Sequence, residues 1–144
     1  MILIYGDSLA QGLTLSKPHH TEAFPGYTIE QLLNNIFGLS FLLDEDQYEC
    51  VVIIAGTNDL GCSLNHNEII DNLIELHRIA WNRDIPTIMV LTYNREFNKK
   101  LKEKLGYEIR YCDYLEYTKD RCNDDIHLNE VGRQMLQREL DNLV

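Results

Sequence analysis

Short, continuous apolar runs alternate along this chain with amphipathic segments. Such runs, rich in β-branched residues, are typical of strands in a parallel sheet that is covered on both faces. The runs that predict strands are Met1–Tyr5, Cys50–Ala55, Thr87–Leu91, a weaker one at Glu108–Cys112, and a short edge strand at His20–Phe24.

The segments between these runs have the spacing of amphipathic helices. Thr28 is expected to cap a helix that continues through Ile36 toward Gly38. A longer helix is predicted from Asn65 or Asn67, a lysine-rich helix from Arg95 to Gly106, and a last helix from near Asn129. The apolar residues expected to face inward on the long helix are Ile69, Ile70, Leu73, Ile74 and Leu76.

Strands that alternate with helices predict βαβ units and a parallel sheet. We therefore expect one domain over residues 1–144, with a three-layer α/β/α, flavodoxin-like fold. Its parallel five-stranded sheet should have the strand order 2-1-3-4-5 and helices on both faces. In such sheets ligands bind beyond the carboxyl ends of the strands.

Composition narrows the possible partners. The net charge of −10 argues against nucleic-acid binding, which needs clustered basic residues. No segment has the length of a membrane span, and no signal peptide precedes the first strand, so a cytoplasmic protein is expected. The cysteines at 50, 62, 112 and 122 lack metal-ligand spacing and are interpreted as free thiols.

Polar residues that could perform chemistry follow the predicted strands. The first strand is followed by Gly6-Asp7-Ser8-Leu9 and the edge strand by Pro25-Gly26-Tyr27. The central strand is followed by Gly56-Thr57-Asn58-Asp59, and the last strand is followed by Asp124-Asp125-Ile126-His127. These motifs, in this order over nearly the whole chain, resemble the SGNH hydrolases, also called the GDSL esterase/lipase family.

The resemblance implies an ester hydrolase with Ser8 as nucleophile, His127 as general base and acid, and Asp124 orienting His127. Because positions i and i+3 of a helical turn share a side, Asp124 is favoured over Asp125. The implied oxyanion hole combines the Ser8 N–H, the Gly26 N–H and the Asn58 side chain. No metal or cofactor is implied.

Several of these residues also have simpler interpretations. Ser8 could be a helix N-cap and Gly26 a turn glycine. Asp7 and Asp59 are interpreted as acceptors that fix loops. The other histidines have weaker claims. His77 is expected in boundary packing, and His19 and His20 could line the pocket. Thr92 and Tyr93 are expected at its edge.

The leading hypothesis is a serine esterase that hydrolyses small, short-acyl esters through an acyl-serine intermediate. Only residues 9–20 separate the first strand from the next, which leaves little chain to wall an acyl pocket. The alternatives are an acyltransferase or carbohydrate deacetylase with the same residues, or an inactive binding module. A phospho-acceptor signalling domain fits poorly, because Asp7 has no second acid beside it. The expected partner is a small-molecule ester, and the oligomeric state is not predicted.

Overall fold

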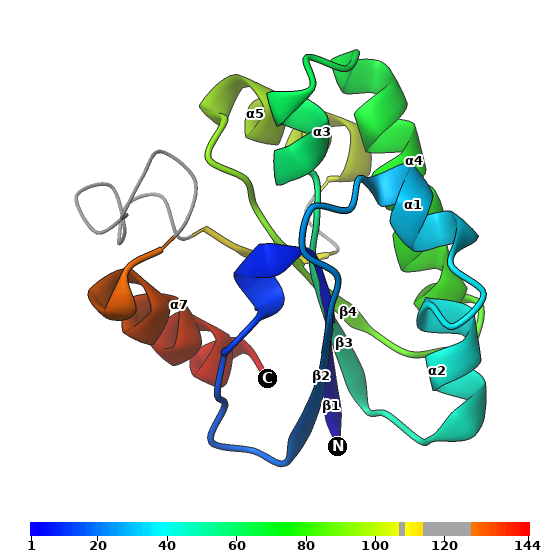
Figure 1. Ribbon diagram of the computed structural model, residues 1–144, viewed down its shortest axis with the longest axis vertical. Coiled ribbons are helices and arrows are strands. Elements are labelled where there is room, and N and C mark those ends of the chain that lie inside the picture. The colour runs from blue at the N-terminus through cyan, green and yellow to red at the C-terminus, as the bar shows by residue number, and fades with distance from the viewer. Residues whose placement is uncertain (107–108, 114–127) are drawn as a thin grey trace.

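A five-stranded parallel sheet forms the centre of the molecule (Figure 1). The computed structural model describes residues 1–106, 109–113 and 128–144. The strand order β2-β1-β3-β4-β5 confirms the predicted topology. The strands are β1 (Ile2–Gly6), β2 (His19–Ala23), β3 (Cys50–Ile54), β4 (Thr87–Val90) and β5 (Arg110–Cys112).

Helices cover both faces of the sheet, as the continuous apolar runs predicted. Alternate side chains of a strand point to opposite faces, so Leu3 and Tyr5 enter one core while Ile2 and Ile4 enter the other. The first face is covered by α1 (Ile29–Asn34), α2 (Leu39–Glu45), α4 (His66–Trp81) and α5 (Arg95–Leu105). The second is covered by the segment after β1 and by α7 (Glu130–Leu143).

The long helix α4 follows its predicted pattern. Asn65 is the N-cap, and its side chain accepts from the N–H groups of Asn67 and Glu68. All five residues predicted to face inward are buried. The lysine-rich helix α5 likewise buries Phe97 and Leu101, whereas its lysines face outward.

The predicted helix from Thr28 toward Gly38 was wrong in its extent. Helix α1 ends at Asn34, and Ile36, which was expected on this helix, lies beyond it and is 80% exposed. The Asn35 side chain accepts from the Phe37 N–H at 3.0 Å, which holds a turn instead of another helical turn. Gly38 is then the N-cap of α2, a helix that the sequence analysis did not predict.

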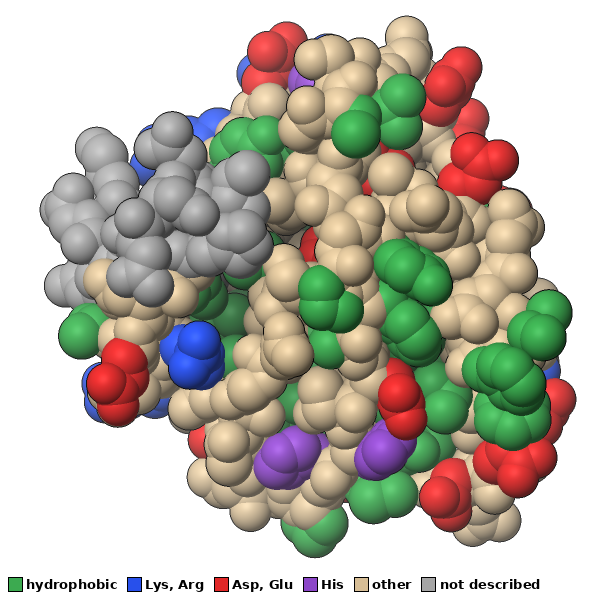
Figure 2. Space-filling view, viewed as in Figure 1, with side chains coloured by type: hydrophobic (Ala, Val, Ile, Leu, Met, Phe, Trp, Pro, Cys, Tyr) green, Lys and Arg blue, Asp and Glu red, His purple; other side chains and the backbone are tan. Residues whose placement is uncertain are grey.

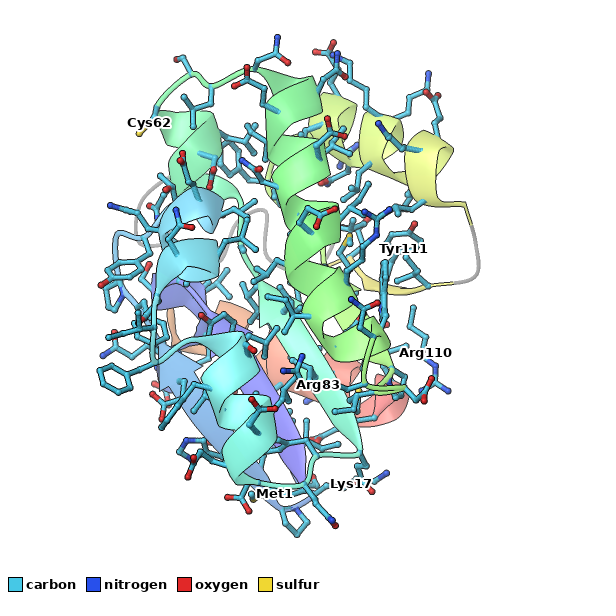
Figure 3. All side chains as sticks on the ribbon, turned by 90° about the vertical axis from the view of Figure 1, so that its right-hand side faces the viewer. Met1, Lys17, Cys62, Arg83, Arg110 and Tyr111 are labelled. Carbon is cyan, nitrogen blue, oxygen red and sulfur yellow. The ribbon has the colours of Figure 1, made fainter. Side chains whose placement is uncertain are left out.

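The Arg83 side chain links α2 to the C-terminal end of α4 (Figure 3). Its guanidinium donates to Ser40 Oγ at 2.9 Å and to Asp44 Oδ1 at 3.1 Å. It also donates to the Ile79 carbonyl on α4 at 2.8 Å. These bonds position α2 on the same face of the sheet as α4.

His77 was expected at a boundary but is fully buried between α4 and the sheet. Its Nδ1 lies 2.7 Å from Thr87 Oγ1, which also accepts from Trp81 Nε1 at 2.9 Å. Burial without a charged partner disfavours the imidazolium and lowers the pKa of His77 to about 3. The imidazole is therefore neutral at pH 7.

The cysteines that the structure describes are free thiols, with Cys50 and Cys112 buried in strands and Cys62 exposed. Cys122 lies outside the described residues. Within the described part of the chain, no helix has both the length and the apolar character needed to cross a membrane.

Candidate active site

The chain segments that leave β1, β2 and β3 are bonded to one another at the carboxyl ends of these strands (Figure 1). The Asp7 N–H donates to the Ile54 carbonyl at 3.0 Å, and the Phe24 N–H donates to the Gly6 carbonyl at 2.8 Å. Gly6 allows this approach, because a Cβ there would lie 1.9 Å from the Ile54 oxygen. The three predicted motifs nearest the N-terminus therefore lie on neighbouring chain segments at the carboxyl end of the sheet.

Ser8 is the first residue of the short 3-10 helix η1 (Ser8–Ala10). The N-cap of η1 is Asp7, whose Oδ1 accepts from the Leu9 N–H at 2.9 Å. Capping therefore does not account for a serine at position 8. Asp7 is 1% exposed and fixes this loop, as predicted for a loop-fixing acceptor.

Gly26 lies in a tight turn directly after β2. The Tyr27 N–H donates to the Phe24 carbonyl at 3.1 Å, with Pro25 and Gly26 at the centre of the turn. Gly26 has φ +81°, so the sequence matches a type II turn, which requires a positive φ at its third residue. The rings of Tyr5, Phe24 and Tyr27 contact one another in series, first edge-on and then tilted, with centroids 5.6 and 5.3 Å apart, and support this turn.

Asn58 lies on a short helix, α3 (Thr57–Gly61), which the sequence analysis did not predict. Its Nδ2 donates to the Tyr27 carbonyl at 2.9 Å, so it is fixed against the turn that contains Gly26. A primary amide carries two N–H donors. Tyr27 uses one donor of Asn58, and no described residue accepts from the other.

Asp59 connects α3 to the start of α1. Its carboxylate accepts from the Ile29 N–H, at 3.0 Å to Oδ1 and 3.3 Å to Oδ2. Burial raises the pKa of Asp59, and the Ile29 N–H partly opposes this by stabilising the carboxylate. Asp59 is thus a loop-fixing acceptor, as predicted.

A pocket of about 370 Å³ opens beside Ser8. Its lining residues are Ser8, Leu9, Gln11, Gly12, Leu128 and Arg133. Leu128 follows His127 in the sequence and is 7% exposed. The predicted residues Asp124 and His127 themselves lie outside the described residues, so their roles stay predictions.

Two other expectations about the pocket can be compared with the structure. His19 and His20 begin β2 and pair with Ile2 and Leu3, at the opposite end of the sheet from Ser8. The suggestion that they line the pocket was wrong, because they are the first residues of a parallel strand, whereas Ser8 follows the last residue of β1. Thr92 is buried and bonded to Asn98 at 3.0 Å, which anchors the chain after β4.

The sequence analysis missed two features of this site. The carbonyl of Tyr27 and the N–H of Ile29 hold Asn58 and Asp59, but backbone groups carry no sequence signal. Arg133 on α7 also lines the pocket, and its position depends on tertiary packing. Among the residues that the structure describes, no group of three or more His, Cys, Asp or Glu could hold a metal ion.

Comparison with known proteins identifies the fold. No family model matches the sequence, and no curated protein matches it. Solved structures do match: AlinE4, an SGNH-hydrolase family esterase, is 26% identical, with TM-score 0.68 over 99% of this chain and 93% of that chain.

Two further structures show the same likeness. The psychrotrophic esterase EstA from Pseudoalteromonas sp. is 18% identical, with TM-score 0.73, and covers 98% of this chain and 94% of that chain. A GDSL-like lipase from Bacteroides thetaiotaomicron is 16% identical, with TM-score 0.75 over 99% of this chain and 86% of that one. The chain therefore has the SGNH hydrolase fold that its motifs predicted.

Proposed function

We propose that this protein is a serine hydrolase that cleaves small, short-acyl esters through an acyl-serine intermediate. The observation that carries the proposal is that the chain segments after β1, β2 and β3, which contain Ser8, the Gly26 turn and Asn58, are bonded to one another at the carboxyl ends of these strands. Ligands of open parallel sheets bind at this edge. The esterases AlinE4 and EstA, which share the fold, support the same reaction class.

In the proposed reaction the Ser8 hydroxyl attacks the ester carbonyl carbon while His127 accepts its proton. The tetrahedral intermediate then collapses, the C–O bond to the alcohol breaks, and His127 returns the proton to the leaving oxygen. Water, which gives a proton to the same histidine, then attacks the acyl carbon. The bond from this carbon to Ser8 Oγ breaks, His127 returns the proton to Ser8, and the carboxylic acid leaves. Asp124 orients His127 and stabilises its protonated form.

The negative charge that develops on the carbonyl oxygen requires fixed donors. In this proposal they are the N–H of Ser8, the N–H of Gly26 and the second N–H of Asn58. The bond from Asn58 to the Tyr27 carbonyl holds the amide in place before substrate arrives. Preorganised donors lose no free energy to reorientation during the reaction, which is why they are effective.

Two features support this assignment over simpler ones. Asp7 rather than Ser8 caps η1, so no capping role explains the serine. Leu128, next to His127 in the sequence, lines the pocket that contains Ser8. A base that accepts the proton of Ser8 is needed beside this pocket.

The test is hydrolysis of p-nitrophenyl acetate by the wild type and by Ser8→Ala. We expect Ser8→Ala to lose essentially all turnover, by up to about 10⁶-fold. Ser16→Ala is the matched control: Ser16 is exposed, lies in the same segment and bonds only to Asp141 in the described structure. Equal turnover by wild type and Ser8→Ala would rule out the proposal. Transfer of the acetyl group to an added alcohol would favour the acyltransferase alternative.

A further inference from the structure

Arg133 is a cation that shares a pocket with Ser8. It lies on the first turns of α7 and is half-buried. In the part of the chain that the structure describes, its guanidinium has no hydrogen bond or ion pair. Arg83 and Arg110, by contrast, each donate to a carboxylate or a carbonyl. Because Arg133 is half-buried and lines the pocket, its guanidinium donors can bind a ligand there.

The face of the guanidinium is turned toward Gly12, at the position that a Cβ on this residue would occupy. An ideal Cβ on Gly12 would be 3.8 Å from both Cζ and Nε of Arg133 and 3.9 Å from Nη1. A point at equal distances from these three atoms lies over the face of the guanidinium plane. The N–H donors lie along the edges of that plane, where they can bond a carboxylate or phosphate in bidentate geometry.

The molecule as a whole carries a net negative charge. The chain has 23 acidic and 13 basic residues, so its overall field repels negative charge. Figure 2 shows blue Lys or Arg surface over α7, beside the tan and green surface of the segment that follows β1. An anion that reaches Ser8 therefore needs a local cation, and Arg133 is the cation that lines this pocket.

We propose that Arg133 binds an anionic group, a carboxylate or a phosphate, of the ester whose carbonyl is attacked by Ser8. The inference rests on the proposed function and narrows its substrate class to small anionic esters. A pocket of about 370 Å³ is in the size range of small-molecule sites. Arg133 is thus a specificity residue: it selects substrates by charge and takes no part in bond making.

Turnover of matched ester pairs tests this selectivity. One pair carries the charge on the acyl side: p-nitrophenyl hemisuccinate and its methyl ester. The other carries it on the leaving group: 4-acetoxybenzoate and its methyl ester. For at least one pair, we expect Arg133→Gln to lower the ratio of kcat/KM, charged over neutral, by about 10- to 100-fold. Arg133→Lys keeps the charge and should restore part of the ratio.

Arg138→Gln is the matched control, because it removes one positive charge from an exposed position on the same helix. It should leave both ratios as in the wild type. Ratios in Arg133→Gln within twofold of the wild type for both pairs would overturn the proposal. If Arg133→Gln fails to fold, Arg133→Lys decides, since loss of the bidentate geometry alone should lower the ratio.

A binding experiment separates this proposal from the proposed function. Benzoate and inorganic phosphate are each titrated into Ser8→Ala protein, with amide signals followed by NMR and benzamide as the neutral control. We expect one of the anions to shift the Gln11 and Gly12 signals, and Arg133→Gln to abolish the shift. That result supports the anion site even if no ester is hydrolysed, in which case only the proposed function fails. No shift, or an equal shift in Arg133→Gln, would overturn the anion site.

Discussion

After Ser8, Asn58 is the described side chain whose loss should lower catalysis most. Its amide bonds the Tyr27 carbonyl and, in the proposed mechanism, the developing oxyanion. We predict that Asn58→Ala lowers kcat on p-nitrophenyl acetate by about 10²- to 10³-fold, the usual effect of losing one oxyanion donor. Asn67→Ala, an exposed position on α4, is the control and should keep the wild-type kcat. A wild-type kcat in Asn58→Ala would remove Asn58 from the oxyanion hole.

His77 should make folding stability depend on pH. Its folded pKa of about 3 lies below the unfolded value of 6.5, so the unfolded chain binds more protons between these pH values. The free energy of unfolding should therefore fall as the pH drops from 7 to 4, with His77 accounting for roughly 3 kcal/mol of the loss.

Denaturant unfolding of His77→Gln at both pH values measures this contribution. Glutamine does not titrate, so the loss between pH 7 and pH 4 should shrink. Trp81→Phe removes a neighbouring bond to Thr87 without removing a titratable group, and it should keep the wild-type pH dependence. The same pH dependence in His77→Gln as in the wild type would contradict the assignment.

Between elements, Asp59 joins α3 to α1 and so fixes the Asn58 amide relative to the Gly26 turn. Asp59→Ala leaves the Ile29 N–H buried without an acceptor, which should cost about 1–3 kcal/mol of unfolding free energy. We predict that kcat also falls, because α3 is no longer held against α1.

Thr28→Ala is the comparison for this prediction. Thr28 caps the same end of α1 through a capping box with Gln31 but has no bond to α3. It should cost about 1 kcal/mol of stability and leave kcat unchanged. Asp59→Asn retains an acceptor for Ile29 and should recover part of the lost kcat. Equal effects of Asp59→Ala and Thr28→Ala on kcat would show that the link between α1 and α3 does not serve the site.

Elements with strong local signals were predictable from the sequence. Asn65 and the buried isoleucines and leucines after it defined α4, because the helical period continues over several turns. The boundary between α1 and α2 was not predictable, since Leu32, Leu33 and Ile36 continue the same period across it. The turn at Asn35 depends on one side-chain bond, and such a bond competes with helix continuation without changing the hydrophobic pattern.

For the molecule as a whole, the short connection between β1 and β2 determines how much surface can cover a substrate. Only η1 and the following loop lie in this segment, and the pocket beside Ser8 is about 370 Å³. A buried CH₂ contributes about 0.8 kcal/mol of binding, so only a walled pocket rewards longer acyl chains. We predict that kcat/KM stays flat or falls from p-nitrophenyl acetate to the octanoyl ester. A steep rise toward octanoyl would reveal a deep acyl site.

The topology was predictable because the apolar runs β1, β3 and β4 are continuous and the motifs after the strands occur in order. The positions of Ser8, Gly26 and Asn58 beyond the carboxyl ends of strands were predictable, since each follows a strand, and their roles stay predictions. The position of Arg133 in the pocket was not predictable, because nothing in the sequence indicates that α7 packs next to Gly12. That contact arises only when α7 packs on the second face of the sheet.

The central claim is that Ser8 is the nucleophile, and covalent labelling tests it most directly. The wild-type protein is treated with a fluorophosphonate probe, digested, and analysed by mass spectrometry to locate the modified residue. The account predicts a single label on Ser8, no label on Ser8→Ala, and normal labelling of Ser16→Ala. A label on another serine, or no labelling of the folded wild-type protein, would contradict it.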